Sequence, residues 1–204
     1  TITTASGSTT VVSGSGNDTI RGGGGNDSLN GGDGDDTVYG GGGTDSLVGG
    51  SGNDILSIGA GTAEGGIGDD RITVGSGIAF GGDGNDRLSA AEESGYQLYG
   101  GDDDDNLVGN GSGTLYGGDG NDDFGETSTA WVFGGTGLDT LYAEGNISAL
   151  TLDSIEVLHL SAVAVTATAK GGAVLWRAGA AAKRFEPLSV SCGVSGMCGV
   201  WGLR

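Results

Sequence analysis

Regularly spaced aspartates are the residues whose type and pattern point to chemistry in this 204-residue chain. Each is the sixth residue of a nine-residue unit, Gly-Gly-x-Gly-x-Asp-x-apolar-x. Units begin at Ser13, Gly22, Gly31, Gly40, Gly49, Gly65, Gly81, Gly100, Gly117 and Gly134. Their aspartates are Asp18, Asp27, Asp36, Asp45, Asp54, Asp70, Asp86, Asp105, Asp122 and Asp139. A fixed period of this kind predicts a repeat architecture.

The make-up of each unit favours a hard cation, and Ca²⁺ in particular. Three glycines per turn permit positive φ angles and close backbone approach, so carbonyl oxygens can turn toward an ion. Ca²⁺ takes about six to eight oxygen ligands from carboxylates and carbonyls. Zinc is disfavoured because these ligands are all oxygen and His159 is the only imidazole in the chain. The alternative is that each aspartate is solvated and merely caps a turn.

The units over residues 13–142 resemble the repeats-in-toxin family, also called hemolysin-type calcium-binding repeats. The resemblance is closest in the stretches GGDGDDTVY, GGSGNDILS and GGDGNDRLS. It implies an all-β fold, a parallel β-roll (a right-handed β-solenoid) with Ca²⁺ in the turns. A disordered Gly/Asp linker is the alternative, but it does not explain the strict phase. The glycines open no amphipathic helix and precede no Gly-Lys-Ser/Thr, which argues against a nucleotide-binding loop.

Two half-turns make one coil, so every second unit falls on the same edge of the roll. One edge then carries Asp18, Asp36, Asp54, Asp70, Asp86, Asp105, Asp122 and Asp139. The opposite edge carries Asp27 and Asp45, and beyond Ser57 it has no further aspartate of the repeat. If sites form between neighbouring loops, about eight Ca²⁺ ions bind, seven of them on one edge. Their charge would offset most of the formal net charge of −19.

Three units depart from the pattern. Asp103 stands where the unit requires its third glycine, which predicts a strained or reshaped loop. Leu138 precedes Asp139, which suggests a weaker last site. Ser13 replaces the first glycine of its unit, a milder change.

Composition divides the chain into four segments. Residues 1–12 are expected to form a lead-in strand and residues 13–142 the calcium-binding roll. Residues 143–169 alternate apolar and polar residues, which predicts strands that continue and cap the solenoid. Residues 170–204 have no clear period and hold five of the eight Lys and Arg residues. This atypical tail is a loosely ordered segment, a secretion segment or a sequence artefact.

Few other residues have a pattern that suggests chemistry, and no catalytic role is predicted. Cys192 and Cys198 form a disulfide in a secreted protein, or they remain free thiols. His159 lies in a strand-like stretch without a second histidine, which favours a structural role. No metalloprotease or hydrolase motif is present. Carboxylates held ionised by Ca²⁺ are in the wrong state for general acid catalysis.

A row of aromatic residues is expected on the calcium-poor side. Phe80, Tyr99, Tyr116 and Phe133 each directly precede a Gly-Gly pair, and alternation along the strand turns them outward. Stacked coils would align them. They form a binding stripe for a glycan or a protein, or an aromatic ladder covered by residues 143–204.

The sequence therefore indicates a secreted, bacterial-type module that folds on binding extracellular Ca²⁺. Such a module would support export, stability or attachment of a larger protein. Two alternatives remain open: an accessory module of a secreted protease, lipase or polysaccharide epimerase, and an adhesin or surface-layer module. The acidic balance argues against nucleic acid as a partner. No apolar run is long enough for a transmembrane helix, and no signal peptide is visible, which is compatible with export through an uncleaved C-terminal signal.

Overall fold

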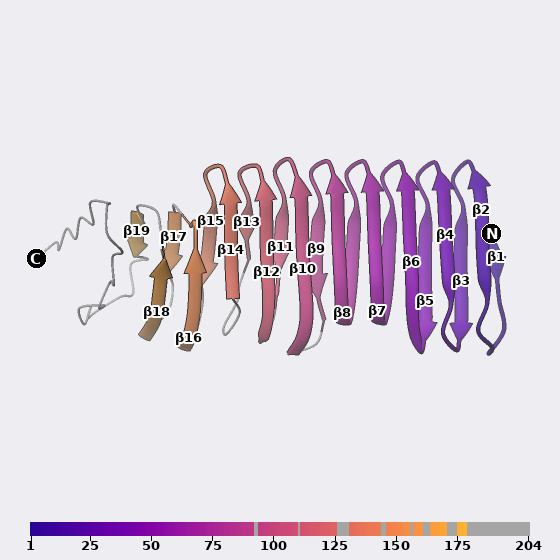
Figure 1. Ribbon diagram of the computed structural model, residues 1–204, viewed down its shortest axis with the longest axis horizontal. Helices are drawn as coiled ribbons and strands as arrows, with labels where there is room; N and C mark the ends of the chain where they lie inside the picture. The colour runs from indigo at the N-terminus through magenta and orange to yellow at the C-terminus, as the bar shows by residue number, and fades with distance from the viewer. Residues whose placement is uncertain are drawn as a thin grey trace, which may run out of the picture.

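The computed structural model describes residues 1–91, 94–109, 111–125, 131–143, 146–155, 157–160, 164–170 and 175–178. Within these residues the chain forms a solenoid of 19 strands, and every pairing between strands is parallel (Figure 1). No helix in this part of the chain is long and apolar enough to cross a membrane. The all-β, parallel β-roll expected from the repeat is confirmed.

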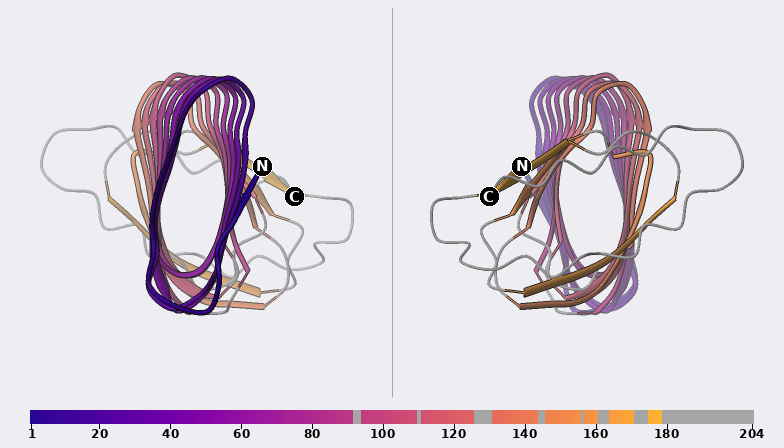
Figure 2. Two further views of the ribbon diagram at one scale, coloured as in Figure 1. Left: turned by 90° about the vertical axis from the view of Figure 1, so that its right-hand side faces the viewer. Right: turned by 90° about the vertical axis from the view of Figure 1, so that its left-hand side faces the viewer.

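Each coil is a flattened oval whose two long sides are strands and whose narrow ends are turns (Figure 2). The first side consists of β1 (Ile2–Thr3), β3 (Thr19–Gly24), β5 (Thr37–Gly42), β9 (Arg87–Ala90), β11 (Asn106–Val108), β13 (Asp123–Phe124), β15 (Thr140–Ala143), β17 (Val157–Leu160) and β19 (Leu175–Ala178). The second side consists of β2 (Thr10–Ser15), β4 (Ser28–Asp33), β6 (Thr44–Ser51), β10 (Ser94–Asp102), β12 (Ser112–Asp119), β14 (Trp131–Thr136), β16 (Asn146–Asp153) and β18 (Ala164–Lys170). β7 (Ile55–Ile67) and β8 (Arg71–Asp83) belong to both sides, because each runs without a break around one narrow end.

The register between coils follows the spacing of the repeat. Ile20 pairs with Val38, 18 residues further on. The coil becomes shorter and then longer: Leu56 pairs with Ile72 after 16 residues, and Leu88 pairs with Leu107 after 19. Insertions and deletions therefore fall in the turns, and the apolar residue of each unit stays aligned with those of its neighbours.

The core is a thin double column of aliphatic side chains between the two sides. The first column is almost fully buried and consists of Ile20, Val38, Leu56, Ile72, Leu88, Leu107, Phe124 and Leu141. The second consists of Leu29, Leu47, Ala63, Ala79, Leu98, Leu115 and Val132. Burying each large side chain contributes roughly 1.5–3 kcal/mol. Since each coil holds only a few such residues, the core alone is a modest source of stability.

An aromatic ring fills part of the interior of one coil. Tyr96 is 1% exposed and lies in β10, in the 19-residue coil between Leu88 and Leu107. Side-chain carbons added at Gly109 or Gly113, one coil later, would clash with its ring. The two glycines thus make room for an aromatic ring in a core that is otherwise mostly aliphatic.

Asp103 holds a backbone conformation that glycine adopts in the equivalent loops. Its φ is 77°, whereas the corresponding glycines Gly84 and Gly120 have φ angles of 119° and 137°. A residue with a β-carbon is strained in this region by about 1–2 kcal/mol, somewhat less for Asp. The strain expected at this unit is therefore present in the fold.

Replacing Asp103 with glycine should stabilise the folded module by about 1 kcal/mol, because the strain disappears. Chemical denaturation in the presence of Ca²⁺ measures the change. Asp83→Gly is the matched control: it removes the same charge from an exposed residue at the end of β8 that has no positive φ. Equal effects of the two substitutions would show that charge, and not backbone strain, is responsible.

Candidate metal centre

The turns at the two narrow ends bring backbone carbonyls close together. At Gly32 and Gly34 the φ angles are 105° and 115°, and a side chain there would clash with the backbone of Gly14 or Gly16 in the preceding coil. Only glycine allows loops to stack this closely. The upper edge in Figure 1 is a regular row of such loops.

The sixth residue of each loop points inward and joins the next coil by a hydrogen bond. The backbone N–H of Asp54 donates to Oδ1 of Asp70 at 2.7 Å, and Asp70 donates in the same way to Asp86. This bond recurs from Asp18 through Asp36, Asp54, Asp70, Asp86, Asp105 and Asp122 to Asp139, with distances of 2.7–3.0 Å. The structure thus brings the eight aspartates expected on one edge into a single row, called the inner ladder below.

The second carboxylate oxygen of these residues is buried and accepts no hydrogen bond from the described residues. This holds for Oδ2 of Asp27, Asp36, Asp45, Asp54, Asp70, Asp86, Asp105 and Asp122. These eight side chains are at most 3% exposed. A buried carboxylate without a compensating partner is very costly, so each oxygen needs a positive charge or a proton.

A carbonyl oxygen of the next coil lies beside most of these carboxylates. A side-chain carbon at Gly65 would clash both with Oδ2 of Asp70 and with the carbonyl oxygen of Gly81. Equivalent pairs of oxygens occur beside Gly22, Gly31, Gly49, Gly65, Gly81, Gly100, Gly117 and Gly134, the last formed by Asp139 and the carbonyl of Ser154. A carboxylate oxygen and a carbonyl oxygen that face each other are ligands of the type that Ca²⁺ takes, and they supply two of the roughly six to eight that it usually has. The residues present therefore fit a calcium ion.

Carboxylates alone would not hold the ion. Among the described residues, no group of three or more His, Cys, Asp or Glu side chains converges on one point. A cation in the loops would depend on backbone carbonyls as well as on one or two carboxylates, as Ca²⁺ sites commonly do.

A second row of side chains runs along the same edge, on the outside of the loops. Oδ1 of Asn17 accepts the N–H of Asp35, and Oδ1 of Asp35 accepts the N–H of Asn53. The row continues in the same way through Asp69, Asn85, Asp104 and Asn121 to the N–H of Leu138. Asn and Asp alternate along it, which keeps its carboxylates two coils apart. Sequence analysis missed this outer ladder, although the alternation is visible at the fifth position of each unit.

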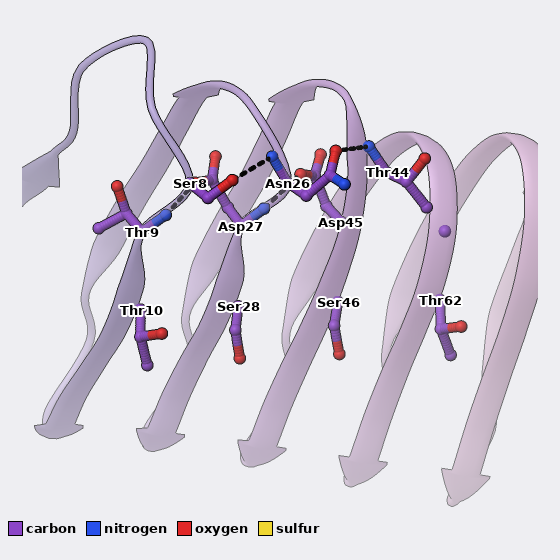
Figure 3. A pocket seen from close by; sticks show the side chains of 11 residues that line it. Ser8, Thr9, Thr10, Asn26, Asp27, Ser28, Thr44, Asp45, Ser46 and Thr62 are labelled. Carbon is purple, nitrogen blue, oxygen red and sulfur yellow. Dashed lines mark hydrogen bonds between the residues drawn. The ribbon is translucent and has the colours of Figure 1, made fainter.

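The opposite edge carries a short version of the inner ladder (Figure 3). The N–H of Asp27 donates to Oδ1 of Asp45 at 2.9 Å, and the N–H of Thr9 donates to Oδ1 of Asp27 at 2.8 Å. Thr9 thus takes the place of an aspartate. The next coil pairs Asp45 with Gly61, which has no side chain to continue the row. The two edges are unequal in the structure, with eight aspartates on one and two on the other.

Residues 4–12 form one more half-coil, which sequence analysis treated only as a lead-in. Thr9, its sixth residue, and Val11, its eighth, align with Asp27 and Leu29. Oγ of Ser8 accepts the N–H of Asn26, as Asn and Asp do in the outer ladder (Figure 3). Gly7 at the fourth position and Val11 at the eighth are the residues from which this half-coil could have been predicted.

Comparison with known proteins agrees with this geometry. The family model of the RTX calcium-binding nonapeptide repeat (4 copies) matches residues 3–38, 21–56 and 30–63. Residues 3–63 thus carry RTX calcium-binding repeats. No curated protein and no solved structure matches the chain. The later RTX units, from Gly65 onward, repeat the hydrogen-bonding pattern of the matched region.

Burial gives the carboxylates of the RTX ladder an unusual affinity for protons. It raises the pKa of Asp105 to about 8 and that of Asp70 to about 7. It raises the pKa values of Asp54, Asp86 and Asp122 to about 6. Hydrogen bonds from backbone N–H groups oppose the shift, whereas neighbouring carboxylates add to it. Without a cation, folding therefore draws these groups toward their neutral form.

The four aromatic residues on the calcium-poor side form a continuous stack. The ring centroids of Tyr99 and Tyr116 are 4.5 Å apart with planes 3° from parallel, and Phe80 and Phe133 extend the stack at 4.9 and 4.8 Å. Each contact contributes about 0.5–1.5 kcal/mol beyond burial. Because the inner rings face each other, a partner would reach only their edges. Binding of a glycan or protein there remains a prediction, and the residues proposed to cover the row lie largely outside the described part of the chain.

Three candidate residues remain. His159 lies in β17 at the C-terminal end of the solenoid. Cys192 and Cys198 lie outside the described residues, so their disulfide stays a prediction.

In the absence of divalent cations, the β-sheet circular dichroism signal should rise as the pH falls from about 8 to about 5. The pKa values of the folded state exceed those of the unfolded chain, so the folded state binds more protons and its stability is lost as the pH rises. High salt at pH 8 is the control, since about 1 M NaCl screens exposed charges without protonating buried ones. Equal folding in high salt, or no gain at low pH, would contradict the expectation.

Proposed function

We propose that this RTX module binds about eight Ca²⁺ ions and folds as it does so, acting as a secreted, non-catalytic part of a larger protein. The observation that carries the proposal is the set of eight buried carboxylate oxygens that accept no hydrogen bond from the described residues. Seven of them lie beside a carbonyl oxygen of the next coil, as does Oδ2 of Asp139, and seven of these eight carboxylate–carbonyl pairs lie on the edge that bears the inner ladder.

Electrostatics supports the coupling of binding and folding. Carboxylates in adjacent coils lie about 5 Å apart. At that distance two like charges repel by about 3 kcal/mol at an effective dielectric of 20. The 48 glycines add a large entropic cost of ordering the backbone. Without cations the thin core has to overcome both terms, so the module would be mostly unfolded.

The same coupling suits a protein that crosses from the cell interior to the outside. Extracellular calcium modules commonly have Kd values of about 10⁻⁴–10⁻³ M. An ion affinity in this range would leave the chain unfolded at intracellular calcium levels and folded after export. The module would then support export, stability or surface attachment of the protein that contains it.

Two related roles are compatible with the same geometry. As an accessory module of a secreted enzyme, the roll would share its polypeptide with a catalytic domain. As an adhesin or surface-layer module, it would self-associate or bind to cells in the presence of calcium. The stack of Phe80, Tyr99, Tyr116 and Phe133 is the surface on which such an attachment would be sought.

Calcium titration should convert an unfolded chain into a β-sheet protein with about eight ions bound, since metal binding supplies the folding free energy. Circular dichroism measures folding, and calorimetry measures the number of ions. The same β signal in EDTA and in millimolar Ca²⁺ would contradict folding on binding.

The same titration tests the ladder residues. Asp86→Asn keeps an oxygen that can accept the N–H of Asp70 but replaces the carboxylate, so it should bind one ion fewer. The control is Asp69→Asn in the outer ladder, where Asn53 and Asn85 already accept the same type of hydrogen bond. Its ion count should equal that of the wild type. A count unchanged in both variants would rule out Asp86 as a ligand.

A further inference from the structure

The first two half-coils share one departure from the later units, at the first position of the unit. The first residue of the unit is Thr4 in one and Ser13 in the other, whereas the units that begin at residues 22–134 all start with glycine. Both residues carry a hydroxyl group. Each lies at the N-terminal start of one edge of the solenoid.

In eight of the nine later units, the space beside the first glycine holds two oxygens, a carboxylate oxygen and a carbonyl oxygen. Beside Gly31, for example, these are Oδ2 of Asp36 and the carbonyl oxygen of Gly49. A β-carbon on Gly31 would clash with both. This is the space where a cation would bring the two oxygens together.

In the first two units, a hydroxyl group enters the equivalent space and donates to the equivalent carbonyl. Oγ of Ser13 donates to the carbonyl oxygen of Gly31 at 2.5 Å. Oγ1 of Thr4 donates to the carbonyl oxygen of Gly22. These carbonyls therefore have a proton donor that their counterparts in later coils lack.

A half-coil and the loop stacked on it form one rung of an edge. The sixth-position residues of the first two half-coils also differ from those of the later rungs. The Asp18 side chain is 26% exposed, whereas Asp36 and the other members of the inner ladder are at most 2% exposed. On the opposite edge, Thr9 replaces the aspartate, and its hydroxyl donates to the carbonyl of Gly7 at 3.0 Å. Neither rung has the buried carboxylate oxygen without a partner that characterises the rest.

We propose that Ser13 and Thr4 are hydroxyl plugs that take the place of a cation in the first rung of each edge. The inference rests on the proposed binding of calcium to the other rungs. Calcium occupancy then begins at Asp36 on one edge and at Asp27 on the other. The hydroxyl-to-carbonyl hydrogen bonds of Ser13 and Thr4 help to keep the N-terminal end of the solenoid in register without requiring an ion.

The exchange Ser13→Gly tests the proposal. Removing the hydroxyl and its β-carbon opens the space between Asp18 and the Gly31 carbonyl, and calorimetric titration should find one more Ca²⁺ ion per chain than in the wild type. Ser15→Gly is the matched control, because it adds a glycine to the same unit at an exposed residue and should leave the count unchanged. Ser13→Ala should also leave it unchanged, because its β-carbon still fills the space.

The reverse exchange provides a second measurement. Gly31→Ser introduces a plug beside Asp36 and should remove one ion. An unchanged count in Ser13→Gly, or an ion bound beside Ser13 in a wild-type crystal grown with calcium, would overturn the plug while leaving the proposed function intact. If the wild type binds no calcium at all, both the proposed function and the plug are wrong.

Discussion

The structure depends on one electrostatic constraint: a carboxylate oxygen buried without a hydrogen-bond donor needs a positive charge beside it. Among the described residues, eight aspartates are in that position. A proton meets the need at low pH, which is why burial raises the pKa of residues such as Asp105 and Asp70. A calcium ion meets it more completely, because it also draws in the carbonyl of the next coil. The first rungs avoid the need, since there a serine or threonine hydroxyl satisfies the carbonyl.

Other features of the fold follow from this constraint. The loops must stack closely enough for one coil's carboxylate to lie beside the next coil's carbonyl, so the first glycine of the unit cannot carry a side chain. Close stacking in turn demands parallel strands in register, with one inward-facing apolar residue of the unit per half-coil. Where the loop motif is absent, on the calcium-poor edge, β7 and β8 run through the turn as continuous strands. The aromatic stack occupies the second side of the coils that follow, from Phe80 to Phe133.

Much of this arrangement was predictable from the sequence, because a nine-residue period fixes both the coil and the residues that face inward. Counting residues along the repeat is enough to place Asp36 next to Asp18 in the ladder. The same count ends the short ladder after Asp45. The outer ladder was not predicted, because its Asn and Asp residues are ordinary turn formers whose hydrogen bonds appear only when coils are stacked. The half-coil at residues 4–12 was missed since Thr9 replaces the aspartate that marks a unit. Tyr96 was missed because its burial depends on two glycines, Gly109 and Gly113, in the following coil.

The most direct test of the account is a crystal structure in millimolar calcium with an anomalous difference map that locates the ions. The account predicts one ion beside each of the eight carboxylate–carbonyl pairs, seven along the inner ladder and one beside Asp27. It predicts none on the opposite edge beyond Ser57. Ions distributed equally along both edges, or buried Oδ2 atoms that remain without a metal, would contradict it.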